Sequence, residues 1–451
     1  MKSVFRSRLR VLGQAALAVS LLLVHPPSAW PGGKKAAVPK FDISTLVWPP
    51  PPDQPRIKFL GQYRGELDLL NKQQAKGGLL ERIAGVNIAA EERAKMIKPY
   101  AVAVDSKGRV FVSDTPQHLI FVFDLEHKTL DMRGDRAPAN LQNPIGVAVD
   151  EQDRLFVSDS KSHQITCFAP DGKVEGVFGA DNLVRPAGLA VDNPLRRLYV
   201  ADVGGRRIAV FDLDSLKLVR YFADTKGGDK TGALTNPNSI AIDPDGLLYV
   251  TDAIVPRVVV YDTDGNFVRT WGKRGDGPGM FGRPKGIAID ADGHVYVADA
   301  QMNRLQVFSP EGKPLVTFAG KGWGPGQFML MAGLASDSMN RIIAVDQLPP
   351  RIEVFRYITD DEAAAAKKGE KIPERLPTPV AAKGAAPGKT PQEVKQPAAP
   401  AAAPGPTVEE LQKELAELKA KLAGQQSQPK TDGNGTETVD KPSPDTAASP
   451  K

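Results

Sequence analysis

The chain repeats one pattern of hydrophobic and polar positions six times. Each repeat begins with a small apolar segment that ends in Asp, passes through a turn, and continues with alternating large and small residues up to a second Asp. A second apolar run with an aromatic residue near its end follows each time. Alternation with a period of two is typical of β-strands, and Asp-Gly turns between such runs predict antiparallel hairpins. The repeated cores are residues 101–114, 146–159, 188–202, 239–252, 286–300 and 333–346.

The spacing of the repeats predicts how the hairpins assemble. The period is about 42 to 51 residues, which is typical of propeller blades. One four-stranded sheet cannot bury both of its faces, whereas radial stacking of six such sheets buries each sheet against its neighbours. We therefore expect an all-β fold over residues 55–360, a six-bladed β-propeller of four-stranded antiparallel blades.

The sixth repeat has no clear fourth strand after Val354–Tyr357. Residues 56–61, which precede the first repeat, resemble the fourth strands predicted at 267–272 and 315–320. We expect this N-terminal strand to complete the sixth blade, because an open ring would leave unpaired strand edges.

The fifth repeat resembles the NHL-repeat family. The resemblance rests on PKGIAID, GHVYVAD and NRLQVF within residues 284–308, and on the Gly-rich linker at 272–284. It extends over roughly residues 55–358 and implies a propeller fold. It implies no single function, because the family includes binding scaffolds, a zinc-dependent lyase and the related calcium-dependent lactonases.

The segments outside the repeats have other compositions. Residues 1–29 combine four basic residues, a short apolar run and a small-residue cleavage site, which predicts a secretory signal peptide rather than a membrane span. An uncleaved N-terminal anchor is the alternative. Residues 30–54 form a Pro-rich linker that contains Val47, Trp48 and four consecutive prolines. A signal of this kind favours the periplasm or the cell surface of a bacterium.

The C-terminal part, residues 361–451, is rich in Pro, Ala and polar residues and should be disordered. Within it, residues 407–423 predict a short helix with a coiled-coil seam. Such a helix either self-associates weakly or fluctuates without a partner. Residues 66–98 predict a second irregular region, a helical insertion that either packs on the first blade or covers the central channel.

The net charge of +5 changes little in this picture. The predicted signal carries four basic and no acidic residues, so the mature chain has a net charge of +1. This balance gives no indication of a nucleic-acid partner. The single cysteine, Cys167, cannot form an intrachain disulfide, and we interpret it as a small core residue.

Residues shared by all repeats are expected to be structural. The Asp residues that end the first and second strands can accept hydrogen bonds from turn N–H groups. Four arginines stand five residues after the second Asp, and we expect them to contact it. The alternative is a cationic ring that binds an acidic ligand. These arginines are Arg207, Arg257, Arg304 and Arg351.

Residues that differ between repeats are better candidates for binding. The position after the first proline of each repeat holds three polar residues, and the position four after the second Asp adds two histidines and an arginine. Both positions should face the same end of the channel, although ordinary variation on loops would give the same pattern. The candidate ligand site is Tyr100, His118, His163, Arg206, Asn238 and Lys285.

These candidates favour binding over catalysis. A catalytic zinc needs three protein ligands, and His118 and His163 have no clear third partner. A calcium site needs several converging oxygen ligands, and the candidates offer only Asn238. We expect no catalytic residue, metal or cofactor. A polysaccharide module is disfavoured because no aromatic platform is visible at the channel, although Trp271 and Trp323 lie near the linkers.

The leading hypothesis is a secreted, non-enzymatic scaffold that binds a protein or an exported ligand through one loop face. A metal-dependent lyase or hydrolase is the alternative.

Overall fold

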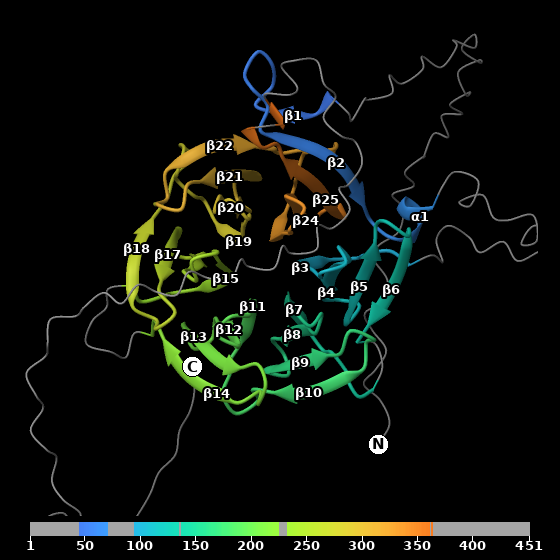
Figure 1. Cartoon of the computed structure of the whole chain (residues 1–451), viewed down its shortest axis with the longest axis vertical. Coiled ribbons are helices and arrows are strands. Elements are labelled where there is room, and N and C mark those ends of the chain that lie inside the picture. The colour runs from blue at the N-terminus through green and yellow to red at the C-terminus, as the bar shows by residue number, and fades with distance from the viewer. Residues whose placement is uncertain (1–44, 71–93, 135–136, 225–231, 361, 364–451) are drawn as a thin grey trace, which may run out of the picture. The chain divides into compact units, whose positions relative to one another are not determined.

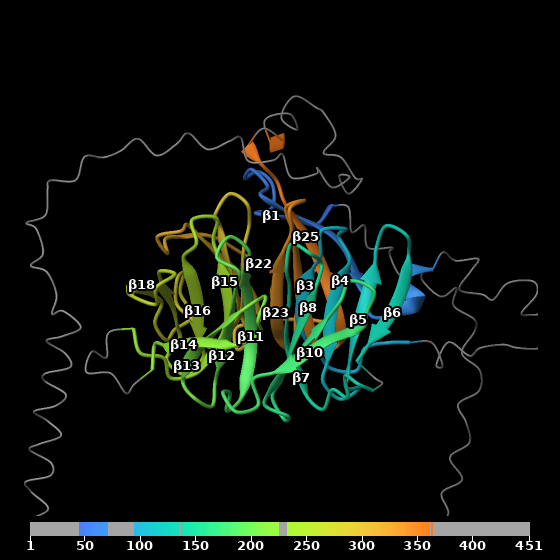
Figure 2. The same cartoon turned by 60° about the horizontal axis from the view of Figure 1, so that its bottom comes forward.

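The computed structural model describes residues 45–70, 94–134, 137–224, 232–360 and 362–363. Six antiparallel sheets surround a central axis within this part of the chain (Figure 1; Figure 2). The fold is therefore an all-β six-bladed propeller, as the repeats predict. The chain divides into two compact units, Met1–Ala381 and Ala382–Lys451, and the second lies entirely outside the described residues.

The first three blades each contain four strands in chain order. Blade 1 comprises β3 (Pro99–Val104), β4 (Val110–Asp114), β5 (Leu119–Asp124) and β6 (Thr129–Arg133). Blade 2 comprises β7 (Pro144–Val149), β8 (Leu155–Asp159), β9 (Gln164–Phe168) and β10 (Val174–Phe178). Blade 3 comprises β11 (Pro186–Asp192), β12 (Arg197–Asp202), β13 (Arg207–Asp212) and β14 (Leu218–Phe222).

The next two blades repeat this arrangement, and the last is completed differently. Blade 4 comprises β15 (Pro237–Ile242), β16 (Leu248–Asp252), β17 (Arg257–Tyr261) and β18 (Phe267–Trp271). Blade 5 comprises β19 (Pro284–Ile289), β20 (Val295–Asp299), β21 (Arg304–Phe308) and β22 (Pro314–Phe318). Blade 6 comprises β23 (Met331–Ser336), β24 (Arg341–Gln347) and β25 (Pro350–Tyr357), with β2 (Ile57–Tyr63) and β1 (Val47–Trp48) added outside them.

The N-terminal strand closes the ring as predicted. β2 pairs antiparallel with β25, from Ile57 opposite Tyr357 to Tyr63 opposite Ile352. β1 then adds a fifth strand, which the assignment of these residues to a linker did not foresee. The ring of Trp48 lies 6.0 Å from that of Phe318 and 5.8 Å from that of Phe355. This aromatic packing holds the two-residue strand against blades 5 and 6.

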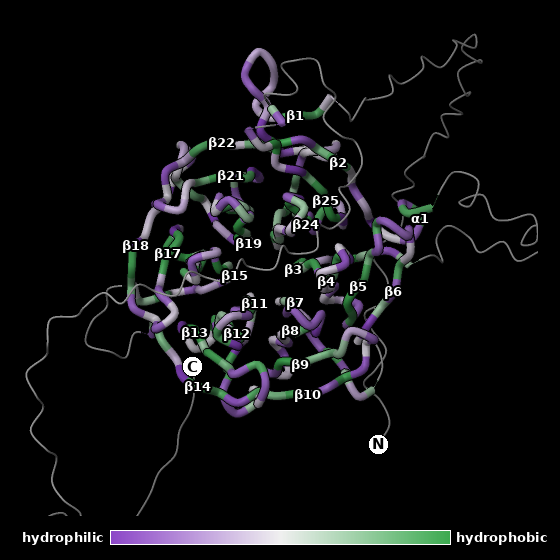
Figure 3. Tube along the Cα trace, viewed as in Figure 1, coloured by the Kyte–Doolittle hydropathy of each residue, from purple (hydrophilic) through white to green (hydrophobic). Residues whose placement is uncertain are grey.

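The core lies between neighbouring sheets. The second and third strands of each blade are almost fully buried, and their apolar side chains form the clusters between blades. Figure 3 shows hydrophobic residues along the strands and hydrophilic residues in the turns. Cys167 is fully buried in this core, and burial raises the pKa of its thiol to about 12. The thiol is therefore protonated, and the residue packs as a small apolar side chain.

Two aspartates in each blade hold the turns in place. In blade 1, Asp105 Oδ1 accepts hydrogen bonds from the backbone N–H groups of Lys107 and Arg109. Asp114 Oδ2 accepts hydrogen bonds from the backbone N–H groups of Ile97 and Lys98, which lead into the first strand. The same two arrangements recur in blades 2, 4, 5 and 6, so the shared carboxylates are occupied by turn N–H groups.

Only the edges of the predicted insertion are described. A short helix, α1 (Glu66–Leu69), follows β2, and Gly65 forms an isolated bridge with Lys95. The remainder of the insertion, the predicted signal peptide, most of the linker and the helix predicted at 407–423 lie outside the described residues. Within the described part, no helix is long and apolar enough to cross a membrane.

Candidate functional site

The propeller has two loop faces with different constructions. We call linker face the end formed by the segments that lead into each first strand and by the turns between second and third strands. The opposite end, the turn face, is formed by the turns that follow the first and third strands of each blade (Figure 2). The candidate ligand residues all belong to the linker face.

The first strands approach one another closely where the channel opens on the linker face. The second and third residues of each first strand lie at a register shift against the second strand. A Cβ atom added at Gly286 would lie 2.6 Å from the carbonyl oxygen of Ala332. The resulting cavity has a volume of about 20 Å³, and Tyr100 and Asn238 contribute to its lining. We call this cavity and Lys285 beside it the channel mouth.

Lys285 is buried at the channel mouth, with 7% of its surface exposed. Its ammonium nitrogen lies 5.4 Å from the centre of the Tyr100 ring, two blades away around the axis. Burial and, to a smaller extent, the positive charges of Arg283 and Lys98 together lower the pKa of Lys285 to about 8. Three cations therefore converge here, and Lys285 is still mostly protonated at neutral pH.

The other three candidates occupy exposed turns instead of the cavity wall. His118, His163 and Arg206 each have a positive φ, between 53° and 61°, at the last position of the turn between second and third strands. The Nδ1 atom of His163 contacts the carbonyl oxygen of Val184 in the following linker. Their common position in the repeat thus follows from a left-handed turn conformation. None of these three residues lines the cavity.

The four repeated arginines bind the linkers of their own blades. Arg207 Nε lies 3.1 Å from Asp202 Oδ2, and its Nη2 donates a 2.9 Å hydrogen bond to the carbonyl oxygen of Asn182. Arg257 donates to the carbonyl oxygen of Ala233 in the same way. Arg304 and Arg351 each donate to several linker carbonyl oxygens. These contacts use the guanidinium groups to fix the linkers, and the arginines do not line the channel mouth.

Blade 6 adds two buried carboxylates to this arrangement. Arg351 Nη2 lies 2.9 Å from Glu353 Oε1 and 3.7 Å from Asp346 Oδ2, and all three side chains are fully buried. Glu353 Oε2 accepts a hydrogen bond from the backbone N–H of Gly326. Burial raises the pKa of Glu353 to about 8, although Arg351 lowers it in part. This cluster holds the linker between blades 5 and 6.

One group of three metal-ligand side chains occurs in the described parts of the chain. It consists of Asp290, Asp292 and His294 on the turn face, with their ligand atoms within 4.8 Å of one another. Asp290 Oδ1 accepts two backbone hydrogen bonds, and Asp290 Oδ2 accepts hydrogen bonds from Tyr296 and from His294 Nδ1. These bonds occupy the carboxylate, so the group is explained as a turn support. His118 and His163 are not part of such a group.

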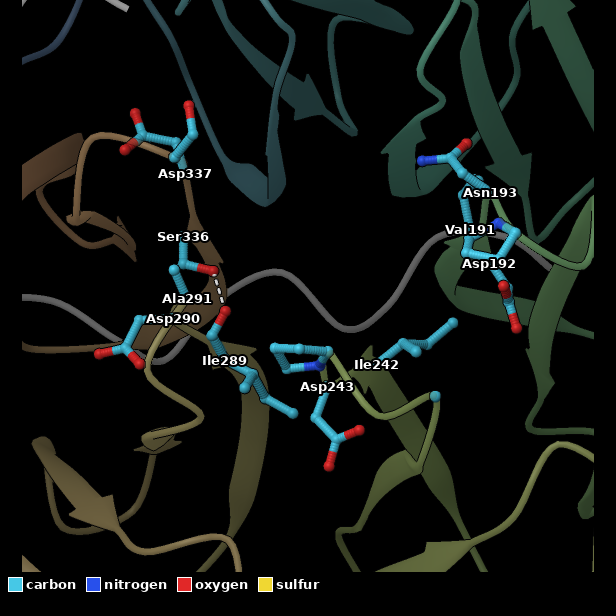
Figure 4. A pocket seen from close by; sticks show the side chains of 14 residues that line it. Val191, Asp192, Asn193, Ile242, Asp243, Ile289, Asp290, Ala291, Ser336 and Asp337 are labelled. Carbon is cyan, nitrogen blue, oxygen red and sulfur yellow. Dashed lines mark hydrogen bonds between the residues drawn. The ribbon is translucent and has the colours of Figure 1, made fainter. Parts of the chain in front are cut away.

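The turn face contains a wider opening of the channel, with a volume of about 410 Å³. It is lined by the ends of four first strands, which include Asp192, Asp243 and Asp290 (Figure 4). Figure 4 shows the carboxylates of Asp243 and Asp290 directed away from the centre of the pocket. Both are bonded to turn N–H groups and to a tyrosine hydroxyl. Asn193, Ser336 and Asp337 also line the opening, and Asp192 Oδ2 makes no hydrogen bond, so the wall keeps polar groups besides the bonded carboxylates.

Exposed apolar side chains gather on the linker face. Trp323 and Ile254 are 59% and 58% exposed. Five more large apolar residues with high exposure lie on the same loops: Ile97, Val184, Val255, Leu330 and Leu348. Within the described part of the chain, the turn face has one, Leu195, and the outermost strands of blades 1 to 5 have one each. We call these seven residues the apolar rim. They have no common signal in the sequence, because they occupy unrelated positions of the repeat.

The linker face is also the basic face. Among the described residues, its loops expose more basic than acidic side chains: Arg64, Lys95, Lys98, Lys161, Arg185, Arg206, Lys273, Arg274, Arg283 and Lys321, against Asp68, Asp181 and Asp276. Acidic side chains are more frequent on the turn face: Glu126, Glu151, Asp171, Asp214, Asp245, Asp264, Asp292 and Glu311, against Lys107, Lys128, Lys173, Lys217 and Lys313. The near-neutral total charge thus hides a separation of charge between the two ends of the channel.

Known proteins resemble the chain through its fold. A family model described as a 6-bladed beta-propeller matches residues 234–305, and an NHL repeat model matches residues 141–168. No curated protein matches the sequence. Similar solved structures include a streptogramin B lyase, with 10% identity, a TM-score of 0.45, and coverage of 58% of this chain and 94% of that chain.

Two further structures are similar to the same extent. The virginiamycin B lyase from Staphylococcus aureus has 13% identity and a TM-score of 0.43, and the match covers 58% of this chain and 95% of that one. A gluconolactonase from Xanthomonas campestris has 19% identity and a TM-score of 0.45, with coverage of 58% and 86%. Identities this low carry no information about activity. The two family models and the six sheets identify the chain as a six-bladed β-propeller that contains an NHL repeat.

Proposed function

We propose that this propeller is a non-enzymatic binding module that holds an acidic protein partner on its linker face. The observation that carries the proposal is the apolar rim, which places seven exposed large apolar side chains on one face and one on the other. These side chains come from loops of blades 1, 3, 4 and 6, and exposed apolar surface rimmed by polar residues is typical of protein interaction sites. The exposed basic side chains on the loops of the same face would attract a partner of negative charge and speed its association.

The site chemistry agrees with binding rather than turnover. The shared aspartates and arginines are bonded to turns and linkers. The cavity at the channel mouth, of about 20 Å³, is too small to enclose a substrate molecule, since ligand pockets typically have volumes of about 300–1,000 Å³. The turn-face opening of about 410 Å³ is large enough, but its Asp243 and Asp290 carboxylates are bonded to turn N–H groups and to a tyrosine hydroxyl. Export to the periplasm or the cell surface is part of the same proposal and rests on residues 1–29.

The test compares matched variants on the two faces. Ile254→Ser and Leu348→Ser together alter the apolar rim, whereas Leu195→Ser alters a side chain of similar exposure on the turn face, 49% against 58% and 47%. Proteins from an extract of the source organism would be captured on the mature wild-type protein and on each variant, and quantified by mass spectrometry.

Loss of two buried apolar contacts should weaken a specific partner at least about tenfold. We expect acidic proteins that the wild type and Leu195→Ser retain equally and that the double variant loses. Equal retention by all three proteins, or equal loss in Leu195→Ser, would contradict the proposal. Circular dichroism and thermal melting establish that the variants are folded.

A further inference from the structure

Lys285 differs from every other buried charge in the molecule. Among the described residues, it is the one buried charged side chain that makes neither a hydrogen bond nor an ion pair. Its recorded side-chain contact is with the Tyr100 ring. The backbone at this position is fixed, because Thr251 Oγ1 donates a 2.6 Å hydrogen bond to the Lys285 carbonyl oxygen. The amine is therefore held at the channel mouth by the fold, without a counter-ion.

The neighbours of Lys285 make an anion the natural partner. Arg283 and Lys98, the charged groups that act on it, are both basic. At the corresponding position of blade 6, between Lys285 and Tyr100, the residue is the small Ala332. An ammonium group that is largely removed from water and lies near two other cations is costly unless a negative group compensates it. Tyr100, whose ring Lys285 contacts, and Asn238 line the cavity, and Lys285 lies beside it next to the lining residue Gly286.

The size of the cavity restricts what the anion can be. A volume of about 20 Å³ exceeds by little the 10–15 Å³ that a single water molecule requires. A nucleotide or a sugar acid would not fit inside. A carboxylate at the end of a protein side chain or of a protein chain needs only its oxygen atoms to enter, while the rest of the partner lies on the surrounding face.

We infer that the channel mouth is a carboxylate-binding site, in which Lys285 pairs with an acidic group that a partner protein inserts at the centre of the linker face. The inference rests on the proposed function, because the partner must first lie on this face. It assigns the partner a specific feature, one carboxylate flanked by apolar residues that contact the apolar rim.

Short peptides provide the probe. The first is acetyl-Leu-Gly-Glu-Gly-Leu-amide, the second has Gln in place of Glu, and the third is the Gln peptide with a free C-terminal carboxylate. Isothermal titration calorimetry at low salt would measure their affinities for the full mature protein. A charge-assisted hydrogen bond at a buried amine should favour the Glu peptide over the Gln peptide about tenfold.

Two variants make the result specific. Lys285→Met keeps an apolar side chain over Tyr100 and removes the charge, and we expect it to bind the Glu and Gln peptides equally. Lys321→Met removes an exposed charge from the same face and should keep the preference for Glu. A free C-terminal carboxylate that binds in the Lys285-dependent manner supports the inference and identifies the chain end as the source.

Other outcomes would overturn the inference. They are a wild type that does not distinguish Glu from Gln, and a Lys285→Met protein, folded by its melting curve, that keeps the full preference. Failure of the proposed function gives a different result. In that case the binding of the Glu peptide still depends on Lys285, whereas the capture of partner proteins is unaffected by the variants of Ile254 and Leu348.

Discussion

Replacement of Glu353 by Gln tests the buried ionic cluster of blade 6 against a control that the protein itself supplies. In blade 5, Gln306 occupies the corresponding position of the third strand. Its Oε1 accepts a hydrogen bond from the backbone N–H of Gly279, and its Nε2 donates to the carbonyl oxygen of Met280. Glu353 accepts the equivalent hydrogen bond from Gly326. A neutral amide therefore already performs this role in one blade.

The structure gives the sign and size of the effect. Burial raises the pKa of Glu353 from an ordinary value of 4.5 to about 8. Because the folded state holds this proton more tightly, its contribution to stability is complete below pH 4.5 and is lost as the pH rises towards 8. The full shift corresponds to about 5 kcal/mol as an upper bound. After the replacement Arg351 keeps Asp346 as a carboxylate partner at 3.7 Å, so its charge is not left uncompensated. The raised pKa shows that the ionised form of Glu353 is disfavoured despite Arg351, and we expect a gain of about 1–3 kcal/mol at pH 9, below the upper bound.

The assay is urea denaturation of the wild type and Glu353→Gln at pH 4.5 and pH 9. We expect the two proteins to differ by less than about 1 kcal/mol at the lower pH, where Glu353 is protonated, and the variant to be more stable at the higher pH. Gln306→Glu is the mirror variant and should lose stability as the pH rises. A Glu353→Gln protein that loses stability relative to the wild type between pH 4.5 and pH 9 would refute the reasoning, because the charge would then be net stabilising.

Three further changes should affect stability. Lys285→Met should raise the melting temperature at pH 7 and have little effect above pH 10.5. The lowered pKa of about 8 means that the wild-type fold loses stability as the pH falls from 10.5 towards 8, so the variant should gain about 1–3 kcal/mol at pH 7. Deletion of residues 55–63, which include β2, should cause aggregation or unfolding, since β25 then becomes an exposed edge; a soluble monomer with a cooperative melting curve would contradict this. Gly286→Ala should lower the free energy of unfolding, measured by chemical denaturation, by about 1–3 kcal/mol, because the added Cβ would meet backbone atoms at 2.6 Å. Gly320→Ala is the control and should leave the stability unchanged, because a Cβ there would have nothing within 4 Å.

The fold was predictable because its determinants recur. Alternation along each strand, Asp-Gly turns and six similar units leave few architectures open, and the apolar pattern of residues 56–61 was sufficient to identify the closing strand. β1 was not predictable in the same way. It is two residues long, and it depends on contacts of Trp48 with Phe318 and Phe355 that are distant in sequence. A strand this short has no periodicity of its own.

The candidate site was predictable only in part. The polar residue at the second position of β19 was visible as a departure from the repeat, and the structure places Lys285 beside Tyr100 at the channel mouth. The alignment of His118 with His163 suggested a common ligand, whereas both residues occupy a left-handed turn position. The apolar rim could not be predicted, because exposure of a loop residue depends on the packing of neighbouring blades.

The distribution of bonded groups separates stability from binding in this propeller. Shared residues such as Asp114 and Arg207 make several hydrogen bonds within the fold, so their replacement should lower the melting temperature more than it changes partner affinity once the protein is folded. Lys285 has no such bonds, and its replacement should raise stability while it weakens binding. Opposite changes of the two quantities at one residue are the expected result for a site that the fold maintains at a cost. A Lys285→Met protein that is less stable and binds its partner unchanged would place Lys285 among the structural residues.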